Sequence, residues 1–232
     1  MTTEQLIVYI VVPLVGYFMG SIPFALLIGK ANGVDIRTVG SKNIGATNLG
    51  RALGARFFWQ AFLLDTGKGF LPVLIVSLFL RIWNANPNSV VMIPSWAPLL
   101  TAIACVLGHN YPIWLKFKGG KGVATSLGVV LGFWPLYTLG GIVGGLTFVV
   151  VLLAFRYISL ASIVAAIAFA CAITIFSQQD FPYLHTTLLG SDRAAMVVVA
   201  WLFVAMLIFR HSANISRLLH GTESKVGTPR KK

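Results

Sequence analysis

Long apolar runs alternate with short polar or glycine-rich segments along the whole chain. Seven runs lie near residues 5–29, 57–80, 95–110, 123–134, 137–155, 158–177 and 194–209. Because a helix of about 20 apolar residues spans the hydrocarbon core of a bilayer, the pattern predicts an all-α, polytopic membrane protein with seven transmembrane helices. The fourth run is short and only Pro135 separates it from the fifth, so a re-entrant segment is the alternative there.

Composition supports the membrane interpretation. The 232 residues are 57% hydrophobic and 10% charged, with a mean hydropathy of +0.84, which excludes a water-soluble globular protein. The runs leave little sequence for a second domain, so we expect a single integral-membrane domain over residues 1–232, with a basic tail at about 211–232. The N-terminus carries Glu4 and no basic cluster, which favours a first span over a cleavable signal peptide.

Basic residues are concentrated on alternate loops. The chain has 18 Lys and Arg against 6 Asp and Glu, but they lie between apolar runs, so no nucleic-acid partner is expected. With seven crossings, one side of the membrane has only Arg81 and Arg193 in its loops, and the positive-inside rule predicts an outside N-terminus and a cytoplasmic C-terminus. The cytoplasmic side then collects Lys30, Arg37, Lys42, Arg51, Arg56, Lys116, Lys118, Lys121, Arg156, Arg210, Arg217, Lys225, Arg230, Lys231 and Lys232.

The first cytoplasmic loop, residues 33–54, is rich in glycine and short polar side chains. Glycines allow backbone N–H groups and small polar side chains to converge on one anion, and an arginine can close such a site as a bidentate fork. A flexible, solvated loop would have a similar composition and is the alternative. The candidate ligands are Ser41, Asn43, Thr47, Asn48 and Arg51.

The second cytoplasmic loop, residues 108–126, contains KGGKG directly before an expected helix start. Free N–H groups, the helix dipole and lysines would suit a phosphate. The segment is not a Walker A loop, because Gly122 follows Lys121 at the position where Ser or Thr belongs. A topogenic loop needs lysines but not interleaved glycines, so we favour phosphate binding, with Lys118, Gly119, Gly120, Lys121, Gly122 and Thr125 as candidates.

A third polar cluster follows the last run. At helical spacing, His211, Asn214 and Arg217 share one face. A surface-lying amphipathic helix is the alternative, and it would explain the basic residues but not the Asn beside the His. Within the runs, Asp65 and Lys68 are three residues apart and are predicted to pair. Ser159 and Ser162 could each cap a backbone group or reach the site.

The cytoplasmic side offers few acidic side chains, namely Asp35 and Glu223. Such a site suits an anionic substrate and is poor in the oxygen ligands that Mg²⁺ prefers, so no metal is expected. Neither a Ser-His-Asp order nor the His-x4-Asp motif of many soluble acyltransferases is present. The residues alone therefore predict a metal-free membrane site for one or more phosphates.

Six segments are informative when taken together, namely GSIPFALLIGK, DIRTVGSKNIGATNLGRALG, LLDTGKG, GHNYPIWLKFKGGKGVATSLG, RYISLAS and RHSANISRLLHGTES. In this order they resemble the bacterial PlsY family of integral-membrane glycerol-3-phosphate acyltransferases. The resemblance implies transfer of an acyl group from acyl phosphate to the 1-hydroxyl of sn-glycerol 3-phosphate at the cytoplasmic face of the inner membrane, which yields lysophosphatidic acid and phosphate without a cofactor. An enzyme that makes acyl phosphate would be a partner.

The resemblance also implies roles for single residues. It places the polar side chains of the first loop and Lys121 around the phosphates, Ser162 in the site, and His211 with Asn214 as a pair. Lys42 departs from the family's more usual Gly. Because acyl phosphate is an activated mixed anhydride, orientation and stabilisation of the leaving phosphate suffice. Either His211 or a substrate phosphate oxygen could take the hydroxyl proton, and we favour the substrate.

Two other function classes are compatible with parts of the pattern. A transporter or flippase of a phosphorylated metabolite could use glycine-rich loops, but transporters bind near the midplane, often between repeated halves, and no repeat is visible. A scaffold for anionic lipid would need the basic residues but not the Ser, Asn and His pattern.

Overall fold

The computed structural model describes residues 6–85, 96–178 and 193–227, and every regular element within these ranges is a helix. The predicted all-α class is therefore confirmed. The α-helices are α2 (Val12–Ser21), α3 (Phe24–Ala31), α4 (Ala46–Leu53), α5 (Ala55–Ala85), α6 (Ala97–Asn110), α7 (Val123–Gly132), α8 (Leu136–Phe155), α9 (Ile158–Gln178), α11 (Arg193–Arg210) and α12 (Ser212–Leu219). A π-helical turn, Ile7–Val11, precedes α2, and a 3₁₀ turn, Ile113–Leu115, follows α6.

Five helical segments of the described chain are long and apolar enough to cross a membrane. They are Ile7–Ala31, Ala55–Leu80, Leu136–Phe155, Ile158–Gln178 and Arg193–Arg210. By contrast, α6 has 14 residues and α7 has 10, so at 1.5 Å per residue they extend over about 21 and about 15 Å, less than the roughly 30 Å of a hydrocarbon core. The shortness of the fourth run is thus confirmed, whereas the count of seven crossings stays a prediction.

The first apolar segment contains a break that the hydrophobic pattern did not predict. Ile22 is extended, with ψ of 117°, because the ring of Pro23 disfavours the helical conformation at the residue before it. The Nζ of Lys68 donates a 2.6 Å hydrogen bond to the carbonyl of Ile22. Lys68 also forms a 2.8 Å ion pair with Asp65, which confirms the predicted pairing and leaves neither buried charge isolated.

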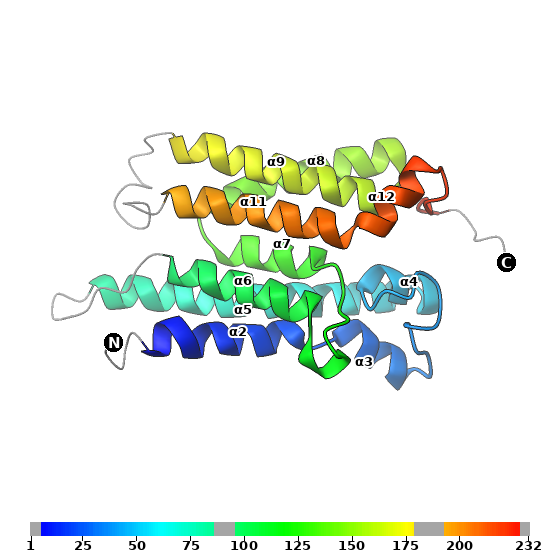
Figure 1. The fold of residues 1–232 in the computed structure, drawn as a ribbon, viewed down its shortest axis with the longest axis horizontal. Coiled ribbons are helices and arrows are strands. Elements are labelled where there is room, and N and C mark those ends of the chain that lie inside the picture. Colours follow the sequence, from blue (N-terminus) through cyan, green and yellow to red (C-terminus); the bar gives the residue numbers. More distant parts are fainter. Residues whose placement is uncertain (1–5, 86–95, 179–192, 228–232) are drawn as a thin grey trace. The chain divides into compact units, whose positions relative to one another are not determined.

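The chain divides into two compact units, Met1–Trp134 and Pro135–Lys232, called unit 1 and unit 2. In unit 1, α2, α5 and α6 run side by side (Figure 1). The backbones of α2 and α6 approach closely, because a Cβ on Gly20 would collide with the carbonyl of Cys105 and one on Gly108 with that of Tyr17. The single membrane domain expected over residues 1–232 stays a prediction.

In unit 2, α8 and α9 pack along each other and α11 packs against α9. The tight α8–α9 turn is made by Arg156, which adopts a left-handed conformation with φ of 65°. Tyr137 of α8 donates a 2.7 Å hydrogen bond to the carbonyl of Met196, where α11 begins. The short helix α12 follows α11 and contacts α9, which places the polar residues after the last apolar run beside the start of α9.

Candidate active site

The first glycine-rich loop is organised by a single side chain, that of Asn48. Its Oδ1 accepts a 2.9 Å hydrogen bond from the N–H of Ser41. Its Nδ2 donates to three carbonyls, of Ile36 at 2.8 Å, Asn43 at 3.0 Å and Val39 at 3.2 Å. Since both amide hydrogens are engaged by the backbone, Asn48 shapes the loop rather than offering a free donor to a ligand.

The remaining polar side chains of this loop are more accessible. Helix α4 begins after Gly45, which places Thr47 in its first turn and Arg51 one turn later on the same face. Arg51 and Ser41 are exposed, and Thr47 and Asn43 are half-buried. The structure therefore gives four of the five predicted ligands of this loop a position from which an anion could be contacted.

Lys42 stands at a backbone position that suits glycine. Lys42 has φ of 58°, in the left-handed region that glycine adopts without strain. A lysine at this position costs about 1–2 kcal/mol in backbone strain. The departure from Gly therefore leaves the left-handed turn in place and adds a positive charge to the loop.

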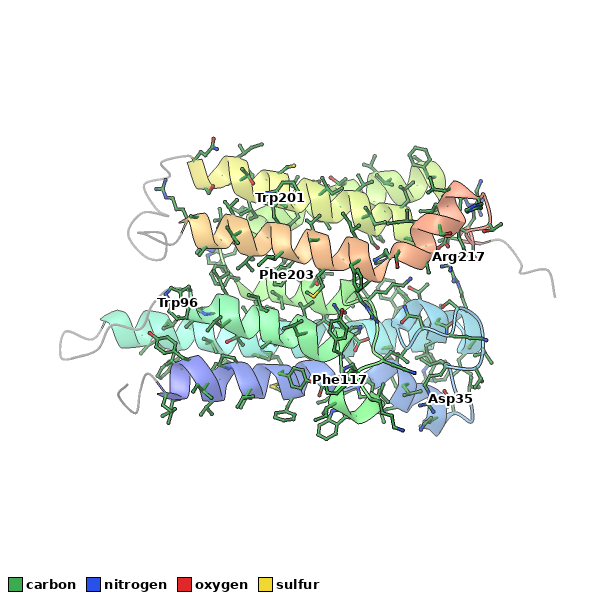
Figure 2. All side chains as sticks on the ribbon, in the orientation of Figure 1. Asp35, Trp96, Phe117, Trp201, Phe203 and Arg217 are labelled. Carbon is green, nitrogen blue, oxygen red and sulfur yellow. The ribbon has the colours of Figure 1, made fainter. Side chains whose placement is uncertain are left out.

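The loop also contains an acid that is fully engaged. Arg37 contacts both carboxylate oxygens of Asp35, with Nη2 at 2.6 Å from Oδ2, at the position labelled in Figure 2. Hydrogen bonds from the side chain and then the backbone N–H of Arg37 lower the pKa of Asp35 to about 2. A carboxyl with that pKa is a weak base, so Asp35 is a poor candidate for accepting a substrate proton.

The second glycine-rich loop lies on the C-terminal end of α6. The N–H of Gly119 donates to the carbonyl of Asn110 and that of Gly120 to the carbonyl of His109, both at 3.1 Å. A Cβ on Gly119 would collide with the carbonyl of His109, and one on Gly120 with its Nε2. A Cβ on Gly122 would lie 2.8 Å from Oδ1 of Asn110, and Gly122 has φ of 79°. The close contact between this loop and the C-terminal end of α6 therefore requires glycine at all three positions.

Helix α7 starts at Val123, directly after Gly122. Its first turn follows directly after the lysines of the loop, with Lys118 exposed and Lys121 half-buried. Phosphate binding at this helix start stays a prediction. Thr125 differs from the expectation, because it is fully buried and its hydroxyl lies 3.1 Å from Nδ1 of His109. The structure gives this hydroxyl a contact inside unit 1 rather than a place among accessible anion ligands.

In unit 2, a carboxylate joins three elements. Oε1 of Glu223 accepts hydrogen bonds from Ser159 at 2.9 Å and from Asn214 at 2.7 Å. Oε2 accepts one from Nε of Arg217 at 2.7 Å, and Arg217 is labelled on α12 in Figure 2. Burial alone would raise the pKa of Glu223, but the hydrogen bonds from Asn214, Arg217 and Ser159 outweigh it and lower the pKa below its ordinary value.

Sequence reasoning missed this role of Glu223, which had been noted only as one of two cytoplasmic acids. The residue lies outside any apolar run, and its partners are 6, 9 and 64 residues away. The sequence signal for a contact between Glu223 and Arg217 was Gly221, which lies between them. Gly221 has φ of 68° and reverses the chain after α12.

His211 is buried and lies at the N-terminal boundary of α12. Its Nδ1 is 2.8 Å from the carbonyl of Leu207. Because a carbonyl can only accept, Nδ1 carries a proton in this contact, and in the neutral ring Nε2 then has the lone pair. Asn214 is also buried, and its N–H donates to the carbonyl of His211 at 2.8 Å. The predicted His-Asn pair is therefore held together by the backbone of α12.

The two serines of the sixth run have different roles. Ser162 is buried and donates to the carbonyl of Ile158 at 2.8 Å, one turn earlier in α9. Ser159 reaches Glu223 instead. Ser162 therefore bonds the backbone, as one alternative predicted, and its role in the site stays a prediction. Ser159 contacts a carboxylate, which neither alternative predicted.

Residues 222–227, which we call the C-terminal strap, fold back onto the α8–α9 turn. The N–H of Val226 donates to the carbonyl of Arg156 at 2.8 Å, and the guanidinium of Arg156 donates to the carbonyl of Val226 at 2.7 Å. Nζ of Lys225 lies 5.4 Å from the ring centroid of Tyr157. These contacts fix the segment that carries Glu223.

The chemistry available to these residues is anion binding and proton positioning. Unit 1 presents guanidinium, ammonium, hydroxyl and backbone N–H donors, all of which favour phosphate oxygens. In the described ranges, His, Cys, Asp and Glu side chains do not gather in groups of three or more that could hold a metal ion.

The chain is similar to known proteins over nearly all of its length. The family model described as glycerol-3-phosphate acyltransferase matches residues 10–221. The glycerol-3-phosphate acyltransferase of Thermotoga petrophila is 42% identical over 216 residues, which cover 92% of this chain and 94% of that protein. That of Geobacillus kaustophilus is 40% identical, with 94% and 96% covered.

Solved structures agree. A crystal structure of PlsY, an integral membrane glycerol 3-phosphate acyltransferase, in its glycerol 3-phosphate form is 38% identical, with a TM-score of 0.75 and coverage of 94% of this chain and 95% of that one. The lysophosphatidic acid form is 37% identical, with a TM-score of 0.73 and the same coverage. This chain therefore belongs to the PlsY family of integral-membrane glycerol-3-phosphate acyltransferases, and it is an acyltransferase.

Proposed function

We propose that the protein transfers a fatty acyl group from acyl phosphate to the 1-hydroxyl of sn-glycerol 3-phosphate, giving lysophosphatidic acid and inorganic phosphate. The observation that carries the proposal is the KGGKG loop seated on α6, which brings Lys121 to the N-terminus of α7. The glycerol 3-phosphate and lysophosphatidic acid forms of the solved relatives support the acceptor and the product.

In the proposed reaction, the acceptor oxygen attacks the acyl carbonyl carbon and the bond from that carbon to the phosphate oxygen breaks. Ser41, Asn43, Thr47 and Arg51 of the first loop, with Lys118 and Lys121 of the second, hold phosphate oxygens and stabilise the departing phosphate. A covalent nucleophile is not needed, because acyl phosphate is already an activated mixed anhydride.

The acceptor proton passes to a phosphate oxygen of the substrate. His211 and Asn214 orient the hydroxyl, with Nε2 of His211 as the acceptor of its hydrogen bond. The Nδ1 contact with Leu207 supports this role, because it fixes the tautomer that leaves Nε2 unprotonated. Glu223 supports it indirectly, since it fixes the amide of Asn214.

The decisive experiment is a donor comparison with the purified full chain in detergent. Incubated with palmitoyl phosphate and glycerol 3-phosphate, the protein should release inorganic phosphate and form lysophosphatidic acid in equal amounts. Palmitoyl-CoA and palmitoyl-acyl carrier protein should give no product under the same conditions. Product from either thioester at a comparable rate would contradict the acyl phosphate assignment.

We further propose that the chain is a single domain of the bacterial inner membrane, with the N-terminus outside, the C-terminus in the cytoplasm, and an enzyme that supplies acyl phosphate as its partner. The excess of Lys and Arg on one set of loops supports this orientation. Cysteines introduced for Asn86 and Thr228 should be labelled from the outside and the inside of spheroplasts, respectively. Labelling of both from one side would exclude an odd number of crossings.

A further inference from the structure

A buried polar network lies in unit 1 next to the second glycine-rich loop. It consists of Asp65 and Lys68 on α5, His109 on α6 and Thr125 on α7, and none of these residues is more than 6% exposed. Oδ1 of Asp65 is 2.8 Å from Nζ of Lys68 and 3.9 Å from Nδ1 of His109. The same Nδ1 is 3.1 Å from the hydroxyl of Thr125.

His109 links this network to the loop. Its Nδ1 faces Thr125 and Asp65, whereas its Nε2 occupies the place of a side chain on Gly120. The carbonyl of His109 also accepts the N–H of Gly120 at 3.1 Å. The ring and the backbone of one residue therefore both support the glycine that precedes Lys121.

The far side of the network is equally fixed. Lys68 donates to the carbonyl of Ile22, in the break between α2 and α3. On α5, a Cβ on Gly69 would collide with the carbonyl of Thr125, so α5 and α7 are in close contact where Thr125 meets the ring of His109. Neither Asp65 nor Thr125 can shift far without moving a helix, so the ring of His109 is held from two sides.

Stability alone gives a weak account of this arrangement. A buried ion pair is often no more stabilising than apolar side chains of similar volume, and a carboxylate near an imidazole commonly serves to orient the ring. The segment that an oriented His109 would position is the loop of residues 119–122, because its Nε2 and its carbonyl contact this loop.

We infer that His109 is a positioning residue, which the Asp65–Lys68 pair and Thr125 orient so that it holds the KGGKG loop, and with it Lys121, in the geometry that binds a substrate phosphate. The inference rests on the proposed function in one respect, namely that Lys121 contacts a phosphate. The placement of the loop by His109 is tested separately from that contact.

The kinetic test compares His109→Leu, His109→Asn and Lys121→Ala in the purified full chain. His109→Leu should raise the KM of the same phosphate substrate as Lys121→Ala, by about tenfold or more, and change kcat much less, because a displaced loop misplaces its ligands. The KM of the double variant His109→Leu/Lys121→Ala should be no higher than that of Lys121→Ala alone. Displacing the loop and removing the ammonium of Lys121 both abolish the same interaction with phosphate. Asn can place a polar atom near the position of Nδ1 but has no atom at the position of Nε2 beside Gly120, so His109→Asn should recover little of the loss.

Amide exchange gives the second readout. His109→Leu should accelerate exchange over residues 119–126 and leave α8 and α9 unchanged. The matched control is His220→Leu, because His220 is exposed and bonds only its own helix at Ser216; it should change neither readout. If His109→Leu does not fold, Thr125→Val removes only the hydroxyl that contacts Nδ1 and should shift KM and exchange in the same direction.

The outcomes separate the two claims. If Lys121→Ala leaves both KM values unchanged, phosphate binding at this loop is wrong, and the exchange data still decide whether His109 places the loop. Additive losses in the double variant, a loss confined to kcat, or unchanged exchange at residues 119–126 in His109→Leu and Thr125→Val would overturn the positioning role.

Discussion

The side-chain amide of Asn48 donates a 2.8 Å hydrogen bond to the carbonyl of Ile36, twelve residues earlier in the chain, and both residues are buried. This bond closes the first glycine-rich loop from the inside. A short segment with little apolar surface of its own obtains a defined shape in this way, because a buried amide with four backbone partners fixes several φ and ψ angles at once.

Replacement of Asn48 should therefore open the loop. Asn48→Asp removes both donors and faces three carbonyls with a carboxylate, so we expect more than about tenfold loss of activity. We also expect faster trypsin cleavage after Lys42, which is exposed in this loop. Asn32→Asp is the control, because its exposed amide donates only to Ile28. Equal cleavage rates in both variants would contradict the structural role.

The charges directed at phosphate should be separable from folding. Arg51→Ala and Lys121→Ala each remove a charge-assisted contact worth about 1.5–3 kcal/mol, so kcat/KM should fall roughly ten- to a hundredfold. Arg51→Lys should also be impaired, because a planar fork becomes a point charge. Arg56→Ala, in the first turn of α5 and exposed, should stay near the wild-type rate. Near-normal activity in all three site variants would argue against a phosphate site.

A methyl group on Gly120 should displace the second loop. Its Cβ would collide with Nε2 of His109, which cannot retreat because the opposite side of the ring contacts Thr125. We expect Gly120→Ala to raise a substrate KM while the protein still elutes as a folded species. Gly145→Ala is the control, since its Cβ would meet no atom within 4 Å. This substitution should stabilise α8 by up to about 1 kcal/mol, because alanine favours a helix more than glycine does. Indistinguishable kinetics of the two variants would refute the close contact between Gly120 and His109.

The pH profile of kcat/KM should distinguish the two candidate proton acceptors. If His211 is the base, His211→Ala should lose about 10² to 10⁴ in rate, and the acidic limb of the profile should vanish. If a substrate phosphate is the base, the limb persists, because the second ionisation near pH 6 belongs to the substrate. We expect persistence, with comparable damage in Asn214→Ala, whose side chain does not titrate. A limb absent only from His211→Ala would make His211 the base.

The carboxylate of Glu223 should make unit 2 acid-sensitive. Its pKa is lowered in the folded protein, so its stabilising contribution is complete above the unfolded value of about 4.3 and is lost as the pH falls through the folded value. Glu223→Gln should therefore melt below the wild type at pH 7, and the difference in Tm should shrink as the pH falls below about 4. A constant difference across this range would show that the charge is not responsible.

The length of the apolar runs predicted most of the long helices, because lipid-facing segments must satisfy their backbone hydrogen bonds internally and remain apolar. The run at 158–177 corresponds to the observed helix Ile158–Gln178, and the run at 137–155 corresponds to the helix Leu136–Phe155. The break at Ile22 was missed although Pro23 marks it, because apolar residues continue on both sides. Helix α4 was missed because a short glycine-containing helix gives no long apolar run.

The candidate site was predictable where a residue acts through its own chemistry and less so where it acts through a partner. Lys121 and Arg51 could be proposed as anion ligands from sequence alone, because each is a positive charge within a glycine-rich loop. The inward hydroxyl of Thr125 and the cluster around Glu223 depend on contacts between helices distant in sequence, which no local pattern contains. Asn48 was identified as polar and site-associated, but its backbone partners required the folded loop.

The C-terminal strap has a consequence for how the protein is made. A chain emerges from the ribosome N-terminus first, so the KGGKG loop and its seat on α6 are synthesised before any residue of unit 2. The strap is different, because Glu223 and Val226 are translated only after α8, α9, α11 and α12. Until then the hydrogen bonds from Ser159 and Asn214 to Glu223, and from Arg156 to Val226, cannot form. A nascent chain can therefore complete its second glycine-rich loop during synthesis, whereas the carboxylate cluster must wait for the last stretch of translation.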